Sequence, residues 1–330
     1  MHRSAPSVHL VKFITVAWAV AMSATDSQAD DAPPRTFVYK QVGDLEIQAD
    51  VYGAAPGAAR PVLVEIHGGA LIGGSRRSIN RRIHDAMLEA GCVAVSIDYR
   101  LAPETKLPEI IADLEDAFRW VREEGPQLFG ADPQRIAVTG GSAGGYLTLT
   151  AGFRVEPRPK ALVALFGYGD LIGEWYSTPS PHPRHNGRKP TEEEARRQVS
   201  GPPISDDRDR NGDGMLFYVW CRQHGAWPQE VSGWNPLTQS ERFNPYMPVN
   251  NVTPDYPPTV LIHGTADTDV PYEQSGMMAA EFERAGVEHQ FISLENGEHG
   301  FGGADPQAID VAYAEAIAFL KEKLDLTAGR

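Results

Sequence analysis

The stretch RIAVTGGSAGGYLTLTA (residues 135–151) decides the fold. Residues 135–139 have the Ile, Val and Thr content of a buried strand, and residues 146–151 can continue as a helix. The turn between them, Gly140-Gly141-Ser142-Ala143-Gly144, fits the G-x-S-x-G pattern that presents a nucleophilic serine between a strand and a helix. Strand and helix approach so closely in such a turn that the positions two before and two after the serine need glycine or a similarly small residue. A glycine-rich turn in which Ser142 only caps the helix is the alternative, and this stretch alone leaves both open.

The composition bounds the class of protein. The chain has 330 residues, of which 42% are hydrophobic, which is enough for one large α/β domain or one domain with an insertion. The formal net charge is −14, and this argues against a nucleic-acid partner and against an anionic membrane surface.

The N-terminal residues are typical of a secretory signal peptide. An apolar run at residues 13–24 follows Arg3 and Lys12, and the small residues Ser27 and Ala29 come after it. We expect residues 1–29 to be removed by cleavage near Ala29, and the protein to be exported, periplasmic or secreted, with no stable membrane span after processing. A retained N-terminal anchor is the alternative.

The rest of the chain alternates between strand and helix patterns. Nearly unbroken apolar strands that alternate with helices indicate a mostly parallel sheet with helices on both faces. This alternation stops at about residues 168–256, which we expect to be a cap inserted into a single catalytic domain spanning residues 30–330. The expected strands are 37–40, 45–52, 62–66, 93–97, 135–139, 160–166, 259–262 and 289–294, and the expected helices are 77–90, 109–124, 273–285 and 306–323.

Four of the expected strands end in residues with catalytic potential. His67-Gly68-Gly69-Ala70 follows the strand at 62–66, and Ser142 follows the strand at 135–139. Asp267 and Asp269 follow the strand at 259–262, and His299 follows the strand at 289–294. The carboxyl ends of parallel strands gather at one edge of a sheet, and this order of glycine loop, serine, acid and histidine is the order expected of an α/β-hydrolase.

These residues have the chemistry of a serine hydrolase. Ser142 needs a base to remove its proton, and His299 can be that base. A buried carboxylate, for which we choose Asp267, would orient the imidazole, with Asp269 in the same loop as the alternative. The amides of Gly69, Ala70 and Ala143 are the expected donors of the oxyanion hole, and for Ala70 this requires a negative φ angle. His67 and His263 flank strands and are expected to be structural.

The sequence resembles α/β-hydrolases of the carboxylesterase type over nearly the whole mature chain. HGGALIGGS (67–75) and DYRLAPE (98–104) resemble the hormone-sensitive-lipase-like esterases, whereas GGSAGG is closer to feruloyl-esterase-like bacterial esterases and arylformamidase-like relatives. HGTADTDVP (263–271) with EHGF resembles dienelactone hydrolases and prolyl-oligopeptidase-like peptidases. Two positions depart from the hormone-sensitive-lipase-like pattern: Ala70 replaces a third glycine, and Gly141 replaces an aspartate.

The resemblance implies a carboxylic ester hydrolase that needs no cofactor. The expected substrate is a small-molecule or acylated-carbohydrate ester, such as a short-chain or plant-derived ester, cleaved through an acyl-enzyme intermediate. An amidase, arylformamidase or peptidase using the same triad is the alternative, and a non-catalytic binding module on this scaffold is a third.

Two features of the insertion leave alternatives open. Asp207, Asp209, Asn211 and Asp213 fit the start of a calcium-binding loop, but Tyr218 stands where a bidentate glutamate is required, so we favour a turn paired with its own arginines. The insertion is also rich in Trp, Tyr and Phe, which suits either a lid over the catalytic cleft or a small satellite core. Whether Cys92 and Cys221 pair does not follow from their spacing.

Overall fold

The computed structural model describes residues 33–326, so the predicted signal peptide lies outside the described residues. Its centre is one eight-stranded sheet with the strand order β1-β2-β4-β3-β5-β6-β7-β8. The hairpin strands β1 and β2 are antiparallel to each other, β2 is antiparallel to β4, and all the other pairs are parallel. The predicted mostly parallel sheet is therefore confirmed. The strands are β1 (Arg35–Val42), β2 (Leu45–Tyr52), β3 (Arg60–Ile66), β4 (Val93–Ile97), β5 (Ala131–Gly141), β6 (Ala161–Leu165), β7 (Thr259–Gly264) and β8 (His289–Leu294).

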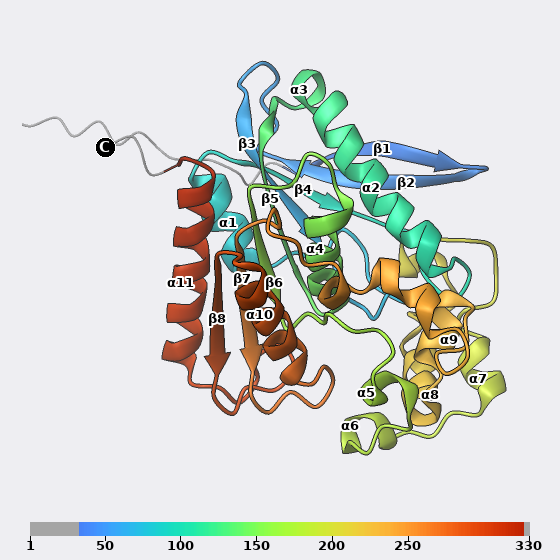
Figure 1. Cartoon of the computed structure of the whole chain (residues 1–330). Coiled ribbons are helices and arrows are strands. Elements are labelled where there is room, and N and C mark those ends of the chain that lie inside the picture. Colours follow the sequence, from blue (N-terminus) through green and yellow to red (C-terminus); the bar gives the residue numbers. More distant parts are fainter. Residues whose placement is uncertain (1–32, 327–330) are drawn as a thin grey trace, which may run out of the picture.

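Helices cover both faces of the sheet (Figure 1). One face packs against α1 (Arg81–Glu89) and α11 (Pro306–Lys323), and side chains of both helices share a hydrophobic cluster with alternate residues of β3, β5, β6 and β7. The other face packs against α2 (Leu107–Glu123), α4 (Ala143–Arg154) and α10 (Glu273–Ala285). A short helix, α3 (Gly125–Leu128), follows α2. None of the helices among the described residues is both long enough and apolar enough to cross a membrane.

Several helix boundaries differ from the predicted ones. Helix α1 begins at Arg81 and not at Arg77, because the side chain of Asn80 accepts a hydrogen bond from the N–H of Ile83 and caps the helix there. Helix α4 begins at Ala143, directly after Ser142. The serine therefore stands at the first residue before the helix, where unpaired helix amides are available.

Residues 168–256, which we call the cap, carry short helices and no strand (Figure 1). Their buried aromatic side chains, among them Tyr176, Phe217 and Trp227, belong to the same hydrophobic cluster as α2, α4 and the sheet. The alternative of a separate satellite core is therefore wrong. The cap elements are α5 (Glu174–Ser177), α6 (Pro183–Asn186), α7 (Glu192–Arg196), η1 (Asp207–Asp209), α8 (Met215–His224), α9 (Trp227–Ser232), η2 (Ser240–Tyr246) and η3 (Pro248–Asn250).

We predict that substitution by alanine at two helical glycines changes the free energy of unfolding in opposite directions. A Cβ atom at Gly144 would lie 2.0 Å from the carbonyl oxygen of Ile66, so Gly144→Ala should lower the free energy of unfolding by about 3 kcal/mol or more. A Cβ atom at Gly276 in α10 would meet nothing within 4 Å, so Gly276→Ala should raise it by roughly 0.5–1 kcal/mol. Urea unfolding of both variants measures the difference, and equal shifts would contradict the close approach of α4 to β3.

Candidate active site

Ser142 lies on a strained turn between β5 and α4. Its backbone angles are φ 57° and ψ −122°, in a region that a residue with a side chain rarely occupies. Two hydrogen bonds fix the turn: the N–H of Ser142 donates to the carbonyl of Leu165 at 2.9 Å, and its carbonyl accepts from the N–H of Tyr146 at 2.9 Å. The alternative in which the Ser142 side chain caps the helix is not observed, because α4 has no side-chain cap.

The small residues around Ser142 are required by the surroundings. A Cβ atom at Gly140 would lie 2.5 Å from the carbonyl oxygen of Gly144 and 2.6 Å from that of Ile66. At Gly141, a Cβ atom would lie 2.9 Å from the ring of Phe166, which occupies the space where a side chain before the nucleophile would go. This contact explains why the chain has glycine there and no aspartate.

His299 and Asp267, the predicted base and acid, lie in contact with each other. The Nδ1 atom of His299 lies 2.7 Å from Oδ2 of Asp267, and the carboxyl group is fully buried. The other oxygen, Oδ1, accepts hydrogen bonds from the backbone N–H groups of Asp269 at 2.8 Å and Val270 at 2.9 Å. Burial opposes ionisation, but hydrogen bonds from His263, His299 and the Asp269 backbone hold the pKa of Asp267 at about 2. Asp267 is therefore a carboxylate at neutral pH, and it fixes the orientation of the imidazole.

His263 supports the acid, a role that the sequence did not reveal. It stands at the end of β7, where its Nε2 atom lies 3.0 Å from the carbonyl of Val270 and 3.3 Å from Oδ2 of Asp267. Its Nδ1 atom lies 2.8 Å from the hydroxyl of Ser275. A protonated Nε2 can donate to both oxygens while Nδ1 accepts from Ser275. The spacing of four residues between His263 and Asp267 was the feature of the sequence that could have indicated this contact.

Phe166 packs against the turns that carry the serine and the histidine. Its ring contacts His299 edge-on with centroids 4.7 Å apart, and the same ring borders Gly141 beside the nucleophile.

Within residues 33–326 there is no hydrogen bond between the Ser142 hydroxyl and His299, and Nε2 of the imidazole lies 3.8 Å from Oδ2 of Asp269. Catalytic hydrogen bonds are often long in unliganded sites and tighten when substrate binds.

The loop after β3, residues 67–74, is the predicted oxyanion loop. Gly69, Ala70 and Leu71 have φ angles of 108°, 57° and 60°. The expectation of a negative φ at Ala70 is wrong, because the loop turns through three consecutive residues in the left-handed region and closes with hydrogen bonds from Ile72 and Gly73 to the carbonyl of Gly69. Glycine tolerates this conformation, whereas Ala70 and Leu71 need support from their surroundings.

Among the described residues the three predicted donor amides have no acceptor, and these include Ala70, whose positive φ fails the expected condition but leaves its N–H unpaired. In the described chain no hydrogen bond uses the N–H of Gly69, Ala70 or Ala143. Gly68 and Ser142 line one cavity, which places the loop beside the nucleophile. Unpaired amides next to a serine hydroxyl are the donors that an oxyanion needs.

His67 is structural, as expected. Its Nδ1 atom lies 2.7 Å from the carbonyl oxygen of Gly68, and its ring stacks on Tyr99 with centroids 4.2 Å apart. Tyr99 also donates its hydroxyl to the carbonyl of His67 at 2.9 Å, so the DYR motif supports the oxyanion loop. Burial lowers the pKa of His67 from its ordinary 6.5 to about 4, and the ring is therefore neutral at pH 7.

We predict that His67 makes the fold acid-sensitive. Its folded-state pKa is lowered, so its contribution is complete above pH 6.5 and is lost as the pH falls through about 4. The loss should reach ~3 kcal/mol in the free energy of unfolding. In His67→Gln this part of the pH dependence should disappear from urea unfolding curves at pH 7 and pH 4. The exposed His224, changed to Gln, is the control and should keep it. Equal pH dependence of wild type and His67→Gln would contradict this assignment.

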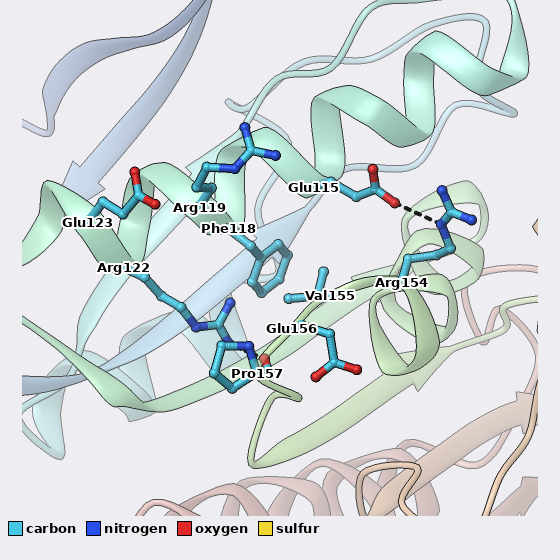
Figure 2. Close-up of a pocket in the computed structure, with 9 residues that line it drawn as sticks. All are labelled: Glu115, Phe118, Arg119, Arg122, Glu123, Arg154, Val155, Glu156 and Pro157. Atoms are coloured by element: carbon cyan, nitrogen blue, oxygen red, sulfur yellow. Dashed lines mark hydrogen bonds and ion pairs between the residues drawn. The ribbon is translucent and has the colours of Figure 1, made fainter.

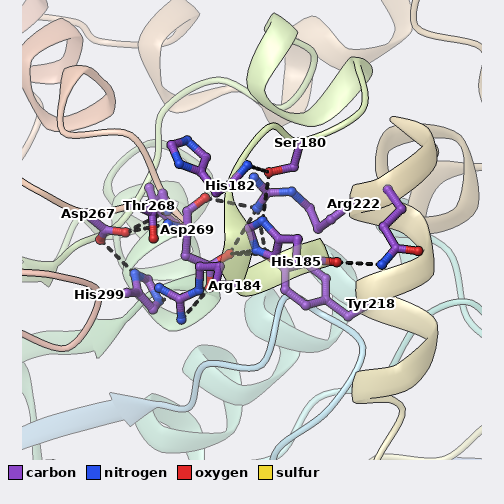
Figure 3. A network of polar contacts seen from close by, with 12 residues as sticks. Ser180, His182, Arg184, His185, Tyr218, Arg222, Asp267, Thr268, Asp269 and His299 are labelled. Atoms are coloured by element: carbon purple, nitrogen blue, oxygen red, sulfur yellow. Dashed lines mark hydrogen bonds and ion pairs between the residues drawn. The ribbon is translucent and has the colours of Figure 1, made fainter. Parts of the chain in front are cut away.

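Asp269 binds the cap and does not orient the imidazole (Figure 3). Its Oδ1 atom accepts hydrogen bonds from Nε2 of His185 at 2.9 Å, from the hydroxyl of Tyr218 at 2.5 Å and from Nη1 of Arg222 at 3.0 Å. Burial opposes ionisation, but the His185 hydrogen bond and the nearby positive charges hold the pKa of Asp269 well below its usual range. Asp267 alone contacts Nδ1 of His299, so the geometry favours Asp267 as the acid.

The four residues of the possible calcium loop are not arranged around a common point. Asp207 accepts a hydrogen bond from the N–H of Gly74, and Asp213 accepts one from the N–H of Met215. The expected pairing of these acids with the arginines of their own turn is wrong, because Arg208 pairs with Asp206 and Arg210 with Glu104. No group of three or more His, Cys, Asp or Glu side chains between residues 33 and 326 is arranged to hold a metal ion. Cys92 and Cys221 are both free and buried, and burial raises the pKa of the Cys92 thiol to about 12.

Two cavities differ in their relation to the site. One of about 310 Å³ is lined by Ser142 together with Gly68, Asn80 and Phe166, but neither His299 nor the predicted oxyanion donors line it. A second cavity of about 560 Å³ lies between α2 and the end of α4, where Arg122 and Arg154 face Glu115 and Glu156 (Figure 2). It contains none of the predicted site residues, so its size carries no argument about catalysis.

Comparisons with solved structures support the fold. A protein of unknown function from Staphylococcus aureus subsp. aureus Mu50 superimposes with a TM-score of 0.70 at 23% identity, covering 88% of this chain and 99% of that one. Esterase 2 of Thermogutta terrifontis with bound propionate gives a TM-score of 0.61 at 24% identity, covering 88% and 94%. At this identity the likeness concerns the fold alone.

Curated relatives share a segment with this chain. The non-reducing polyketide synthase ausA of Aspergillus calidoustus is 27% identical over 341 aligned residues, which cover 87% of this chain and 14% of the synthase. The synthase Preu6 of Preussia isomera is 29% identical, with 82% and 14% covered. The chain thus spans about a seventh of the length of these relatives. The alpha/beta hydrolase fold family matches residues 63–302, which include the nucleophile turn, both loops of the acid–base pair and the oxyanion loop. With this match over well more than half of its residues, the chain belongs to the alpha/beta hydrolase fold family.

Proposed function

We propose that this protein is a serine hydrolase that cleaves carboxylic esters through an acyl-enzyme intermediate on Ser142. The observation that carries the proposal is the pair of Asp267 and His299, 2.7 Å apart, in two loops at the sheet edge where Ser142 occupies its strained turn. Each group has the state that the chemistry needs, because Asp267 is ionised and the oxyanion-loop amides have no competing acceptor among the described residues.

The reaction has two symmetrical halves. In the first, Nε2 of His299 takes the proton of Ser142 as the hydroxyl oxygen attacks the acyl carbon, and the carbonyl oxygen becomes an oxyanion bound by the amides of Gly69, Ala70 and Ala143. The intermediate collapses when His299 gives its proton to the leaving alcohol. Water then attacks the acyl-enzyme in the same way and releases the acid.

The substrate class is the finer part of the proposal. The structure of Thermogutta terrifontis esterase 2 has been solved with propionate, a short carboxylate. By analogy, we propose that the substrate of this chain carries a short acyl group. If the predicted signal peptide exports the protein, its ester is met outside the cytoplasm, where acylated carbohydrates and plant-derived esters are available.

Labelling combined with matched substrates tests the proposal. A fluorophosphonate probe should modify wild-type protein at Ser142, identified by peptide mass spectrometry, and p-nitrophenyl acetate should be hydrolysed much faster than the corresponding anilide. Faster turnover of the anilide would favour amide cleavage. Well-folded protein that is neither labelled nor active on either substrate would contradict the hydrolase proposal and favour a binding role.

A further inference from the structure

We infer that the cap holds the oxyanion loop in its left-handed shape through Asp207, Arg210 and Trp227, which act as positioning residues for the oxyanion hole. The inference deepens the proposed function and rests on it. These three residues come from the η1 turn and from α9 of the cap, and each bonds directly to the backbone of residues 67–74.

Trp227, the first residue of α9, contacts the most strained part of the loop. Its indole N–H donates to the carbonyl oxygen of Ala70 at 2.9 Å, and the side chain is 1% exposed. The rings of Tyr176 and Trp227 stack with centroids 4.0 Å apart, which fixes the direction of the indole. The bond therefore holds the peptide between Ala70 and Leu71. The neighbouring N–H of Ala70 is one of the two expected donors in this loop.

Arg210 binds the next part of the loop from a buried position. Its guanidinium donates to the carbonyl of Ile72 and, at 2.7 Å, to the carbonyl of Ala102. Glu104 neutralises its charge with bonds of 2.9 and 2.5 Å, and both side chains are almost fully buried. A buried, fully paired arginine has a fixed geometry, so it can impose a shape on the carbonyl groups that it binds.

Asp207 closes the loop at its far end. Its Oδ2 atom accepts a hydrogen bond from the N–H of Gly74 at 2.6 Å. The backbone is so close here that a Cβ atom at Gly73 would lie 2.7 Å from the carbonyl oxygen of Asp213 and 2.8 Å from Met215. The segment that resembles a calcium loop therefore packs directly against the oxyanion loop.

Energetics explain why the loop needs these contacts. Each residue with a side chain in a sparsely populated backbone region costs on the order of 1–3 kcal/mol, and Ala70 and Leu71 are two in succession. The carbonyl of Leu71 is bound by the N–H of Ala102 at 2.7 Å, but the carbonyls of Ala70 and Ile72 and the N–H of Gly74 are bound by cap side chains. Lifting the cap away would release the loop, so the cap is a fixed part of the site and not a lid that opens freely.

Two conservative variants and one matched control test the inference. Arg210→Lys removes the planar fork, and Trp227→Phe removes the indole N–H together with one ring of a fully buried side chain. Arg208→Lys is the control, because Arg208 lies in the same turn and pairs with Asp206 without contacting the oxyanion loop. The readouts are hydrogen–deuterium exchange of peptides covering residues 67–74, kcat and KM for p-nitrophenyl acetate, and affinity for a trifluoromethyl ketone, which forms an oxyanion adduct with the serine.

A displaced oxyanion hole predicts a defined pattern. We expect kcat to fall by roughly 30- to 100-fold in Arg210→Lys and about tenfold in Trp227→Phe, with KM nearly unchanged and ketone affinity reduced by the same factors. Exchange in residues 67–74 should be faster in both variants and unchanged in Arg208→Lys. If Arg210→Lys fails to fold, Trp227→Phe carries the test.

The result that overturns the inference differs from the result that overturns the proposed function. The cap does not position the loop if both test variants match Arg208→Lys in hydrogen–deuterium exchange, in kcat and in ketone affinity. Wild-type protein without labelling or turnover would contradict only the hydrolase proposal, and the exchange measurements would still decide whether the cap holds the loop.

Discussion

Ser142→Ala should lower kcat for p-nitrophenyl acetate by roughly 10⁵- to 10⁶-fold, the largest effect expected of any substitution in this chain. Without the hydroxyl no acyl-enzyme forms, and His299 can only assist direct attack by water. The residual rate comes from the oxyanion amides and substrate binding, which the substitution leaves in place. KM should change little, because the lost group acts in the transition state and contributes little to binding.

The measurement requires pre-steady-state and steady-state kinetics on purified variants. Wild-type protein should release p-nitrophenol in a burst equal to the concentration of active sites if deacylation is the slower half, and Ser142→Ala should show none. Ser200→Ala is the matched control, because Ser200 is an exposed cap serine. Its rate should equal that of wild type. Retention of most of the activity in Ser142→Ala would disprove the acyl-enzyme mechanism.

Local patterns predicted the elements and the order of the site along the chain. The glycine spacing around Ser142 reflects a contact with the neighbouring strand β3, and the contact distances at Gly140 and Gly144 agree with it. The pairing of His299 with Asp267 also followed from the sequence, because both stand at carboxyl ends of strands, where parallel strands bring loops together. Such predictions succeed because local backbone geometry and the shared edge of a parallel sheet determine them.

The parts that the sequence did not predict depend on residues far apart in the chain. The left-handed φ of Ala70 depends on Trp227, which is 157 positions away. Arg210 lies 138 positions from Ile72, and the local pattern favoured a turn paired with its own arginines over a calcium loop, so it did not reveal the contact. Contacts of this kind follow from the docking of the cap onto the sheet edge, which carries no local sequence signal.

The second large effect concerns the acid. Asp267→Asn should lower kcat by roughly 10³- to 10⁴-fold with little change in KM, because an amide in place of the carboxylate neither enforces the required imidazole tautomer nor stabilises the imidazolium. Asp269→Asn is a matched substitution two residues away, on a side chain whose nearest oxygen lies 3.8 Å from Nε2 of His299. It should lower kcat by less than about tenfold, since Asp269 makes no hydrogen bond that orients the ring.

Stability should rank the two variants in the opposite order to kcat, with Asp269→Asn the less stable of the two. Asp269 is the buried partner of Arg222, and removing its charge leaves that guanidinium without its ion pair, so Asp269→Asn should lower the free energy of unfolding by about 3 kcal/mol. Kinetics at saturating substrate and urea unfolding, measured on both proteins, separate the two roles. A greater loss of kcat in Asp269→Asn than in Asp267→Asn would reassign the acid to Asp269. The expected pattern leaves Asp267 as the carboxylate that acts through His299 and Asp269 as the one that anchors the cap.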